Sequence, residues 1–92
     1  MRDDHFEWDD AKAAINWAKH SVSFAEARVA FDDPLRLDLA QDDDDEDRVL
    51  LIATTNGRIL AVAYSERGFR IRIISARRAT KNEKNDYFTQ RT

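Results

Sequence analysis

The sequence predicts an α+β domain with two N-terminal helices, a four-stranded antiparallel sheet and a short C-terminal helix. Segments with helical periodicity and helix-capping residues lie near both ends of the 92-residue chain, and β-prone runs fill its middle. An Asn-Gly pair at 56–57 marks a tight hairpin between two of those runs. The length is that of one small domain, which we place at residues 1–92.

The first helix is expected from about Asp10 to His20. Asp9 precedes it as an N-cap, because its carboxylate can accept hydrogen bonds from the free amides of the first turn. At about 100° per residue, apolar and polar side chains separate into two stripes. The apolar stripe, which we expect to enter the core, consists of Ala11, Ala14, Ile15 and Ala18. The opposite stripe is cationic and polar, and it consists of Lys12, Asn16, Lys19 and His20.

A second helix is expected to begin after Ser23. Ser23 to Glu26 has the form of a capping box, in which the serine hydroxyl caps the helix and the Glu26 carboxylate reaches back to the serine amide. The helix is expected to run to about Phe31, because Pro34 soon follows and the residue before a proline is pushed out of helical geometry. Its expected buried side consists of Phe24, Ala27, Ala30 and Phe31.

Four strands are expected in the middle and second half of the chain. Residues 35–39 alternate leucine with charged residues, as is typical of a half-buried strand. Arg48–Thr55 and Ile59–Ser65 flank the Asn-Gly signal, and residues 70–75 alternate arginine with branched apolar residues. These strands should pair in chain order as a meander. The acidic run at 42–47 is expected to be a solvated, mobile loop, because its like charges repel one another.

A short helix is expected at the C-terminal end of the chain. Thr80 to Glu83 has the form of another capping box. Tyr87 and Phe88 are the only large apolar side chains that follow it. Because this helix is short and polar, it needs to dock on the rest of the protein to be stable.

Charge is unevenly distributed along the chain. The formal net charge is −3, but six acidic residues are contiguous at 42–47, and without them the net charge is +3. From residue 58 to the end, nine lysines or arginines stand against three acidic residues. The second half of the chain can therefore attract polyanions such as nucleic acids.

Several chemistries have no support in the sequence. The absence of cysteine excludes disulfides and thiolate metal sites, and it fits a reducing cytoplasm. His5 and His20 are the only histidines, and their spacing to carboxylates resembles no metal-ligand set. Two glycines cannot form a glycine-rich phosphate loop, and the longest apolar run is too short to span a membrane. We therefore expect a soluble protein with no cofactor, no metal and no membrane contact.

The basic residues suit one reaction in particular, the metal-free cleavage of RNA. That reaction needs a base for the 2′-hydroxyl proton, cations at the phosphate and an acid for the leaving oxygen. Arginines near the sheet, and lysines with a histidine on one helix face, supply these groups.

The chain also follows the pattern of a known family over nearly its whole length. In the first half the matching residues are Phe6-Glu7-Trp8-Asp9, Lys12, Asn16, Lys19-His20, Val22-Ser23-Phe24, Ala27, Phe31 and Asp33-Pro34. In the second half they are Arg48, Gly57-Arg58, Leu60, Val62, Tyr64, Arg67, the run from Arg72 to Arg77, Ala79, Glu83 and Tyr87. In this order, the residues resemble the BrnT family of bacterial toxins. Two positions depart from its pattern, since Ser21 and Ala53 stand where glycine is usual.

The resemblance implies a RelE-like toxin fold and a metal-independent endoribonuclease that cleaves mRNA and inhibits translation in the bacterial cytoplasm. It also implies a BrnA-like antitoxin with a ribbon-helix-helix domain, and contact with operator DNA only through that antitoxin. The alternative is a toxin-fold subunit that no longer cleaves RNA and only binds an antitoxin within a DNA-binding repressor. Ser21 follows a helix end, where left-handed geometry is often needed and a serine costs about 1 kcal/mol.

Four residues are candidates for catalysis. His20 can serve as general acid or base, and its alternative role is to interact with the carbonyls at the end of the first helix. Lys19 can contact phosphate, although a lysine on a helix face is usually only solvated. Arg67 and Arg77 can bind the scissile phosphate through paired donors, and the alternative for each is an ion pair with a nearby acid.

Six further residues are candidates for RNA binding: Lys12, Arg58, Tyr64, Arg70, Arg72 and Arg78. Arg70 and Arg72 share a strand face, which either binds the RNA backbone or keeps that face of the sheet soluble. Tyr64 either contacts a base or belongs to the core or its rim.

Overall fold

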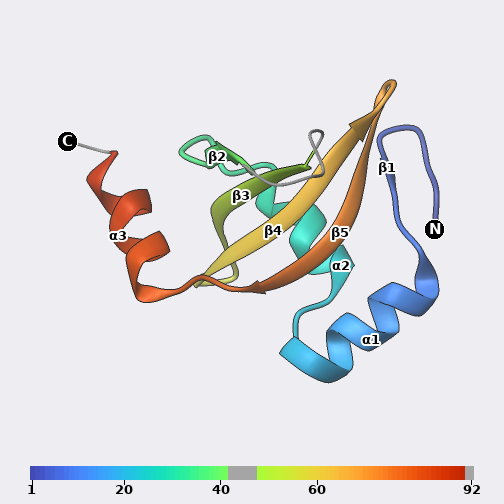
Figure 1. The fold of residues 1–92 in the computed structure, drawn as a ribbon, viewed down its shortest axis with the longest axis horizontal. Helices are drawn as coiled ribbons and strands as arrows, with labels where there is room; N and C mark the ends of the chain where they lie inside the picture. The colour runs from blue at the N-terminus through green and yellow to red at the C-terminus, as the bar shows by residue number, and fades with distance from the viewer. Residues whose placement is uncertain (42–47, 91–92) are drawn as a thin grey trace.

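The computed structural model describes residues 1–41 and 48–90, which form three helices and a five-stranded sheet (Figure 1). In chain order the elements are β1 (Phe6–Glu7), α1 (Asp10–His20), α2 (Phe24–Ala30), β2 (Leu37–Ala40), β3 (Arg48–Thr55), β4 (Arg58–Arg67), β5 (Arg70–Arg78) and α3 (Lys81–Thr89). The strand order across the sheet is β1-β5-β4-β3-β2. The acidic run at 42–47, which we expect to be a mobile loop, lies outside the described residues.

The α+β class is as predicted, but the prediction of a four-stranded antiparallel sheet is wrong. A fifth strand, β1, lies parallel to β5, with Phe6 opposite Ile71 and Glu7 opposite Arg72. The sheet is therefore mixed, while the other three pairs of neighbouring strands are antiparallel. A strand of two residues is too short to show alternation, and its partner lies at the far end of the chain, so no local pattern reveals it.

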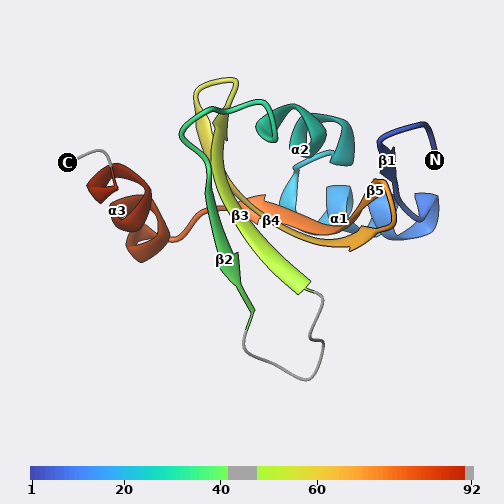
Figure 2. The ribbon, with the colours of Figure 1, turned by 90° about the horizontal axis from the view of Figure 1, so that it is seen from above.

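The helices lie on both sides of the sheet, as Figure 2 shows. The larger core packs the predicted buried side of α2 against one sheet face, and it includes Val22, Phe24, Ala27, Ala30, Phe31, Leu51, Leu60, Val62, Tyr64, Ile73 and Ala76. A smaller core on the other face contains Ile52, Ala61, Ala79 and Tyr87. Burial of these side chains, at roughly 25 cal/mol per Å² of apolar surface, is the main force that holds the layers together.

The predicted orientation of α1 is wrong, because Asn16 and the half-buried Ala13 face the rest of the protein instead of the predicted apolar stripe. Asn16 is 7% exposed, whereas Ile15 of the predicted core stripe is 65% exposed. The Asn16 Nδ2 donates to the carbonyl oxygens of Val22 (2.9 Å) and Ala76 (2.8 Å), and its Oδ1 accepts from the Ala76 amide (3.1 Å). The Asn16 side chain thus hydrogen-bonds to the backbone of β5 at a position that β1 does not reach. Buried backbone groups on an edge strand need such partners.

The end of α1 requires left-handed backbone geometry. Ser21 has φ 56° and ψ 34°, and its amide donates to the Trp17 carbonyl oxygen at 2.9 Å. A side chain is disfavoured in this region, which glycine adopts without strain.

Replacing Ser21 with glycine is therefore expected to stabilise the protein by about 1 kcal/mol, because it removes the strain of a left-handed serine. Thermal unfolding should show the midpoint rising by roughly 4 to 8 °C. Ser23→Gly is the matched control, because Ser23 has φ −85° and its hydroxyl caps α2, so that change should lower the midpoint. A lower midpoint for Ser21→Gly would contradict the account.

The C-terminal helix docks through one buried ring. Tyr87 is 1% exposed, and its hydroxyl donates to the Asp33 Oδ2 at 2.5 Å. The same carboxylate accepts from the amides of Leu35 (2.9 Å) and Thr54 (3.0 Å). Asp33 thus joins α3 to β3 and to the turn after α2, which supplies the docking that a short polar helix needs.

The local turn and capping signals are largely confirmed. Asn56 and Gly57 both have positive φ, 51° and 77°, as the predicted hairpin requires. Thr80 and Glu83 form the predicted reciprocal capping box of α3. The Ser23 hydroxyl caps α2 by accepting from the Glu26 amide at 3.0 Å, but the Glu26 carboxylate binds Arg58 instead of reaching back to Ser23.

Candidate functional site

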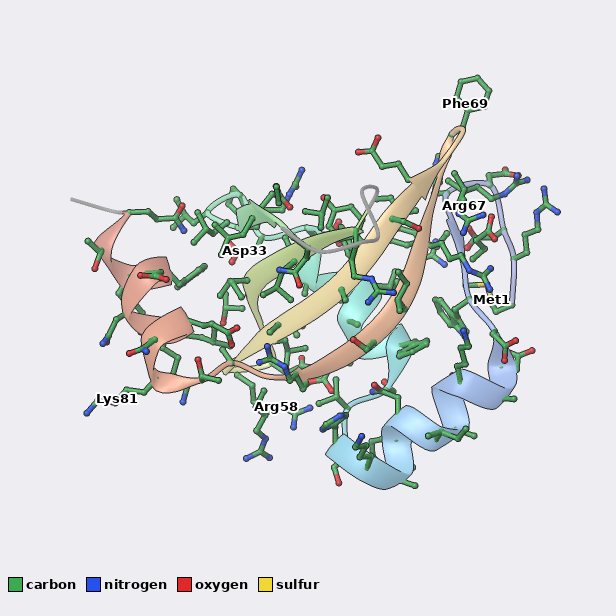
Figure 3. All side chains as sticks on the ribbon, in the orientation of Figure 1. Met1, Asp33, Arg58, Arg67, Phe69 and Lys81 are labelled. Atoms are coloured by element: carbon green, nitrogen blue, oxygen red, sulfur yellow. The ribbon has the colours of Figure 1, made fainter. Side chains whose placement is uncertain are left out.

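The two predicted catalytic arginines lie at opposite ends of the β4–β5 hairpin. Arg67 lies opposite Arg70 beside the turn, whereas Arg77 lies opposite Ala61 near the other end. Figure 3 shows Arg67 near the tip of the hairpin and Arg58 far from that tip, at the other end of β4. Along β5, Arg70 and Arg77 are about 23 Å apart at roughly 3.3 Å per residue. The structure therefore does not bring Arg67 and Arg77 to one phosphate.

One group of predicted residues does come together, in a cavity between α1 and β5. This helix cavity has a volume of about 210 Å³ and is lined by Lys12, Ile15, Asn16, Lys19, His20, Ile74 and Ser75. The hydrogen bonds of Asn16 hold α1 beside β5 and so fix the spacing of the cavity walls. Two ammonium groups, an imidazole and a serine hydroxyl can thus meet a single phosphodiester.

The end of α1 places His20 at the half-buried rim of the helix cavity. Lys19 and His20 form the last turn, where the negative end of the helix dipole favours cations. Within the described residues no hydrogen bond ties the imidazole to a carbonyl, and the helix end is closed by the Ser21 amide instead. The imidazole therefore remains available to a ligand.

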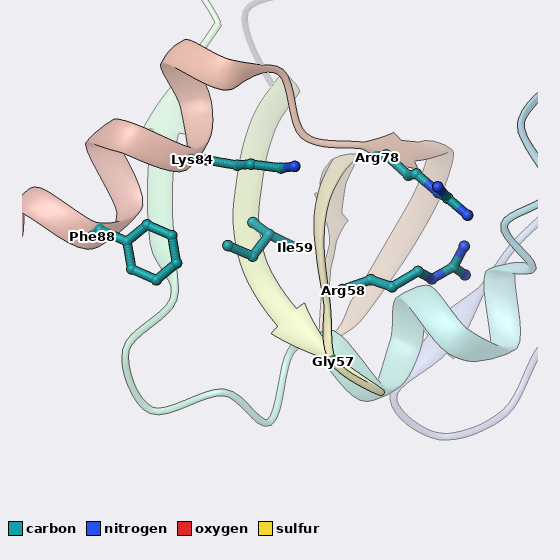
Figure 4. Close-up of a pocket in the computed structure, with 6 residues that line it drawn as sticks. All are labelled: Gly57, Arg58, Ile59, Arg78, Lys84 and Phe88. Atoms are coloured by element: carbon teal, nitrogen blue, oxygen red, sulfur yellow. The ribbon is translucent and has the colours of Figure 1, made fainter.

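A second basic cavity lies where β5 ends, beside the start of β4 and α3. This strand-end cavity has a volume of about 320 Å³ and is lined by Gly57, Arg58, Ile59, Arg78, Lys84 and Phe88. Figure 4 shows Arg58, Arg78 and Lys84 extending in the same direction, while Phe88 lies at the opposite side. Three cations beside two apolar side chains suit a ligand with both phosphate and flat apolar groups.

Arg58 is also tied to the fold. Its guanidinium donates to both carboxylate oxygens of Glu26 on α2, one of them at 3.2 Å from Nε. The hydrogen bond with Glu26 raises the pKa of Arg58. Glu26 thus fixes the position of Arg58 in the wall of the strand-end cavity, while Arg78 is exposed there.

Arg77 forms an ion pair with Glu83, which is the role predicted from the sequence as the alternative to phosphate binding. Its Nη1 and Nη2 donate to the two carboxylate oxygens of Glu83 at 2.7 and 3.0 Å. The hydrogen bond from Arg77 lowers the pKa of Glu83, and the same bond raises the pKa of Arg77. Since Glu83 also caps α3, this pair joins β5 to the helix that carries Lys84 and Phe88.

The other predicted residues are held by the N-terminal segment or by the core. The Arg72 Nη1 donates to the Glu7 carboxylate at 2.8 Å, and the Arg70 Nε donates to the Asp3 carbonyl oxygen at 2.7 Å. Tyr64 is buried, and its hydroxyl donates to Asp38 at 3.1 Å. Burial, together with the charge of Asp38, raises the pKa of Tyr64 to about 12, so its phenol stays protonated at neutral pH.

Sequence reasoning missed several residues of the two cavities. Lys84 and Phe88 are four residues apart on α3, a spacing that places both on one helix face and that could have pointed to them. Ser75 lines the helix cavity because of the way β5 pairs within the sheet, and the sequence around Ser75 gives no sign of that position. Phe69 is 100% exposed at the tip of the β4–β5 hairpin, and its hydrophobic side chain gave no reason to expect this.

Two further searches concern metals and membranes. In residues 1–41 and 48–90, no three His, Cys, Asp or Glu side chains gather as a metal-binding group. Among the helices in those same residues, none has the length and apolar character needed to cross a membrane.

The fold and its two basic cavities define a small α+β protein with a surface suited to a polyanionic ligand. Residues 8–83 match the model of a family described as the ribonuclease toxin, BrnT, of type II toxin-antitoxin systems, and the chain belongs to this family. The predicted membership is confirmed. A type II system implies an antitoxin as partner. A search of curated proteins gives no match.

Proposed function

We propose that this BrnT protein is a metal-independent endoribonuclease that cleaves mRNA in the bacterial cytoplasm and thereby inhibits translation. The observation that carries the proposal is that the helix cavity and the strand-end cavity both line the second half of β5, at Ile74, Ser75 and Arg78. Lysines, arginines and one histidine from four elements there surround a surface that an RNA strand can follow. The family match supports the ribonuclease class.

In the proposed reaction the 2′-hydroxyl of one nucleotide attacks the adjacent phosphorus. A base takes the hydroxyl proton, the bond from phosphorus to the 5′-oxygen breaks, and an acid returns a proton to that oxygen. His20 performs one of these two transfers. Lys12 and Lys19 stabilise the negative charge that develops on the phosphate. The products are a 2′,3′-cyclic phosphate and a free 5′-hydroxyl.

The arginines have supporting roles in this proposal. Arg78 and Lys84 bind phosphates that flank the cleaved bond, where each contributes charge rather than proton transfer. Arg77, whose charge is balanced by Glu83, sets the position of α3. Arg67 lies too far from this end to touch the same phosphate.

Cleavage in the presence of EDTA tests the proposal. Purified wild-type protein is incubated with a defined RNA and excess EDTA, and the product ends are mapped. We expect cleavage with cyclic phosphate ends, and we expect Lys12→Ala plus Lys19→Ala to slow it, whereas the surface pair Lys81→Ala plus Asn82→Ala serves as control. Cleavage that occurs only after magnesium is added would overturn the metal-independent mechanism.

We also propose a BrnA-like antitoxin with a ribbon-helix-helix domain as the protein partner. Type II systems pair the toxin with an antitoxin, which supports a tight complex. Operator DNA should be bound only by that complex, because DNA contact comes from the antitoxin. A gel-shift assay checks this, and a shift with the toxin alone would contradict it.

A second candidate function is a toxin-fold subunit that does not cleave RNA. The observation that favours it is that Arg58, Arg72 and Arg77 each bind a carboxylate of the protein. Arginines held in this way can be purely structural. Expression of the chain without its antitoxin separates the two functions, since growth arrest supports the ribonuclease and normal growth supports the non-cleaving subunit.

A further inference from the structure

The tip of the β4–β5 hairpin carries an aromatic ring that is wholly exposed to solvent. Phe69 is 100% exposed, and Figure 3 shows its ring projecting beyond the sheet. A single exposed apolar side chain is normal in a folded domain, so the residues beside Phe69 decide whether it belongs to an interaction site. The ring lies at the opposite end of the hairpin from the strand-end cavity, and the helix cavity lies between them along β5.

The turn that carries Phe69 is short and regular. Strand pairing continues up to Arg67 and Arg70, so only two residues form the turn between them. Gly68 takes the first of these positions with φ 62°, as a tight hairpin with matching twist requires. Because the turn is fixed by the flanking strands, binding through Phe69 costs little conformational freedom.

The two strands bring like charges together beside the ring. Arg67 and Arg70 are directly opposite one another, an arrangement that is unfavourable without an anion nearby. In the described part of the chain neither guanidinium forms an ion pair, and Arg70 donates only to the Asp3 carbonyl oxygen, at 2.7 Å. Glu66 is opposite Ile71, and alternation along the strands places it on the other face of the hairpin.

We propose that this tip, defined as Arg67, Phe69 and Arg70, binds a single-stranded segment of the RNA substrate. Phe69 stacks on a base, and the two arginines contact the phosphates on either side of it. The inference rests on the proposed function, since the RNA is the one that the proposed site cleaves. Along β5, at roughly 3.3 Å per residue, Arg70 is about 13 Å from Ile74 of the helix cavity and about 26 Å from Arg78 of the strand-end cavity, so the tip binds RNA away from the cleaved bond.

RNA fits these observations better than a protein partner does. An aromatic ring beside two arginines matches the alternation of base and phosphate in a single strand, and stacking needs no particular base. A protein pocket that accepted the phenylalanine would have to place carboxylates next to its apolar wall to meet the arginines. Such a partner is treated below as an outcome of the test.

Binding of uncleavable RNA tests the tip separately from cleavage. A fluorescent 2′-O-methyl RNA of about 20 nucleotides is titrated with wild-type protein, Phe69→Tyr, Phe69→Leu and Phe69→Ser. We expect the serine and leucine variants to bind roughly tenfold more weakly and the tyrosine variant to bind normally, because stacking needs an aromatic ring. Leu35→Ser, which alters another exposed apolar side chain, should bind as the wild type does.

Two further measurements sharpen the test. Arg67→Gln plus Arg70→Gln should lower the slope of log affinity against log salt by about 0.7 for each phosphate that the variant no longer neutralises. An RNA of two nucleotides bound in the strand-end cavity cannot span the roughly 26 Å to the tip, so the Phe69 variants should bind it like the wild type.

Several results would overturn the inference. They are wild-type affinity in Phe69→Ser, equal binding by the leucine and tyrosine variants, or failure of Phe69→Ser to bind the antitoxin while its RNA binding is unchanged. If the wild type binds the RNA through Phe69 but never cleaves a natural RNA, the proposed function fails while the tip assignment stands. If cleavage proceeds and Phe69 has no effect on binding, the tip assignment alone fails.

Discussion

Replacing His20 with alanine is expected to lower kcat/KM for RNA cleavage by about 10²- to 10⁴-fold, which is the usual contribution of a general acid or base. The imidazole lines the helix cavity together with Lys12 and Lys19, and the end of α1 does not use it as a hydrogen-bonding cap. The measurement is single-turnover cleavage of a defined RNA in EDTA between pH 5 and 9. Loss of His20 should also change how the cleavage rate depends on pH, because one of the two proton-transfer groups is then missing.

The second histidine of the chain is the matched control. His5 is exposed near β1, and its backbone, rather than its ring, makes the hydrogen bonds that involve it. His5→Ala should therefore cleave within about twofold of the wild-type rate. Retention of the full rate and the same pH profile by His20→Ala would contradict the assignment of His20 to proton transfer.

Replacing Asn16 with alanine is expected to lower the free energy of unfolding by about 2 to 4 kcal/mol, because buried backbone groups are left without partners. The Asn16 side chain makes three hydrogen bonds, one to Val22 and two to Ala76. For a domain of this size such a decrease is a large part of the total stability, which is typically about 5 to 15 kcal/mol. Urea unfolding followed by circular dichroism measures it.

An exposed asparagine provides the comparison for this change. Asn82 lies in the first turn of α3, on the surface, and Asn82→Ala should change the unfolding free energy by less than about 0.5 kcal/mol. If Asn16→Ala were equally mild, the hydrogen bonds between α1 and β5 would not be what holds the helix in place.

Much of the fold could be predicted from local patterns. The capping residues Asp9, Ser23 and Thr80 each precede a helix, and the Asn56-Gly57 pair forms the expected hairpin. These signals depend on interactions between residues that are close in sequence, so a short stretch of sequence is enough to predict them. β1 could not be found in the same way, because a strand of two residues is defined only by its distant partner.

The orientation of α1 shows where periodicity fails as a guide to burial. Alanines contribute little apolar surface, so the stripe that includes Ala14 and Ile15 gave only a weak preference for the core. The unpaired backbone of β5 at Ala76 offered Asn16 two hydrogen-bonding groups, and that pairing decided which face is buried. A requirement set by a strand sixty residues away is invisible in the helix sequence.

Only part of the candidate site could be predicted from the sequence, because the rest depends on tertiary contacts. Helical spacing brought Lys12, Lys19 and His20 to one side of α1, and the structure keeps them together. The separation of Arg67 from Arg77 follows from the hairpin register, in which neighbours of the turn lie far from the strand end. Acidic partners across the fold, such as Glu83 for Arg77, are likewise set by tertiary contacts.

The short parallel strand also governs how the protein behaves at high concentration. β1 and Asn16 together cover the outer edge of β5. The exposed edge strand of the sheet is then β2, which has only four residues. A short edge strand with a charged residue such as Asp38 resists pairing with the edge strand of another molecule. Removal of residues 1–7 would expose a second, longer strand edge, that of β5. We expect the shortened protein to be less soluble, although it keeps all of its proposed catalytic residues.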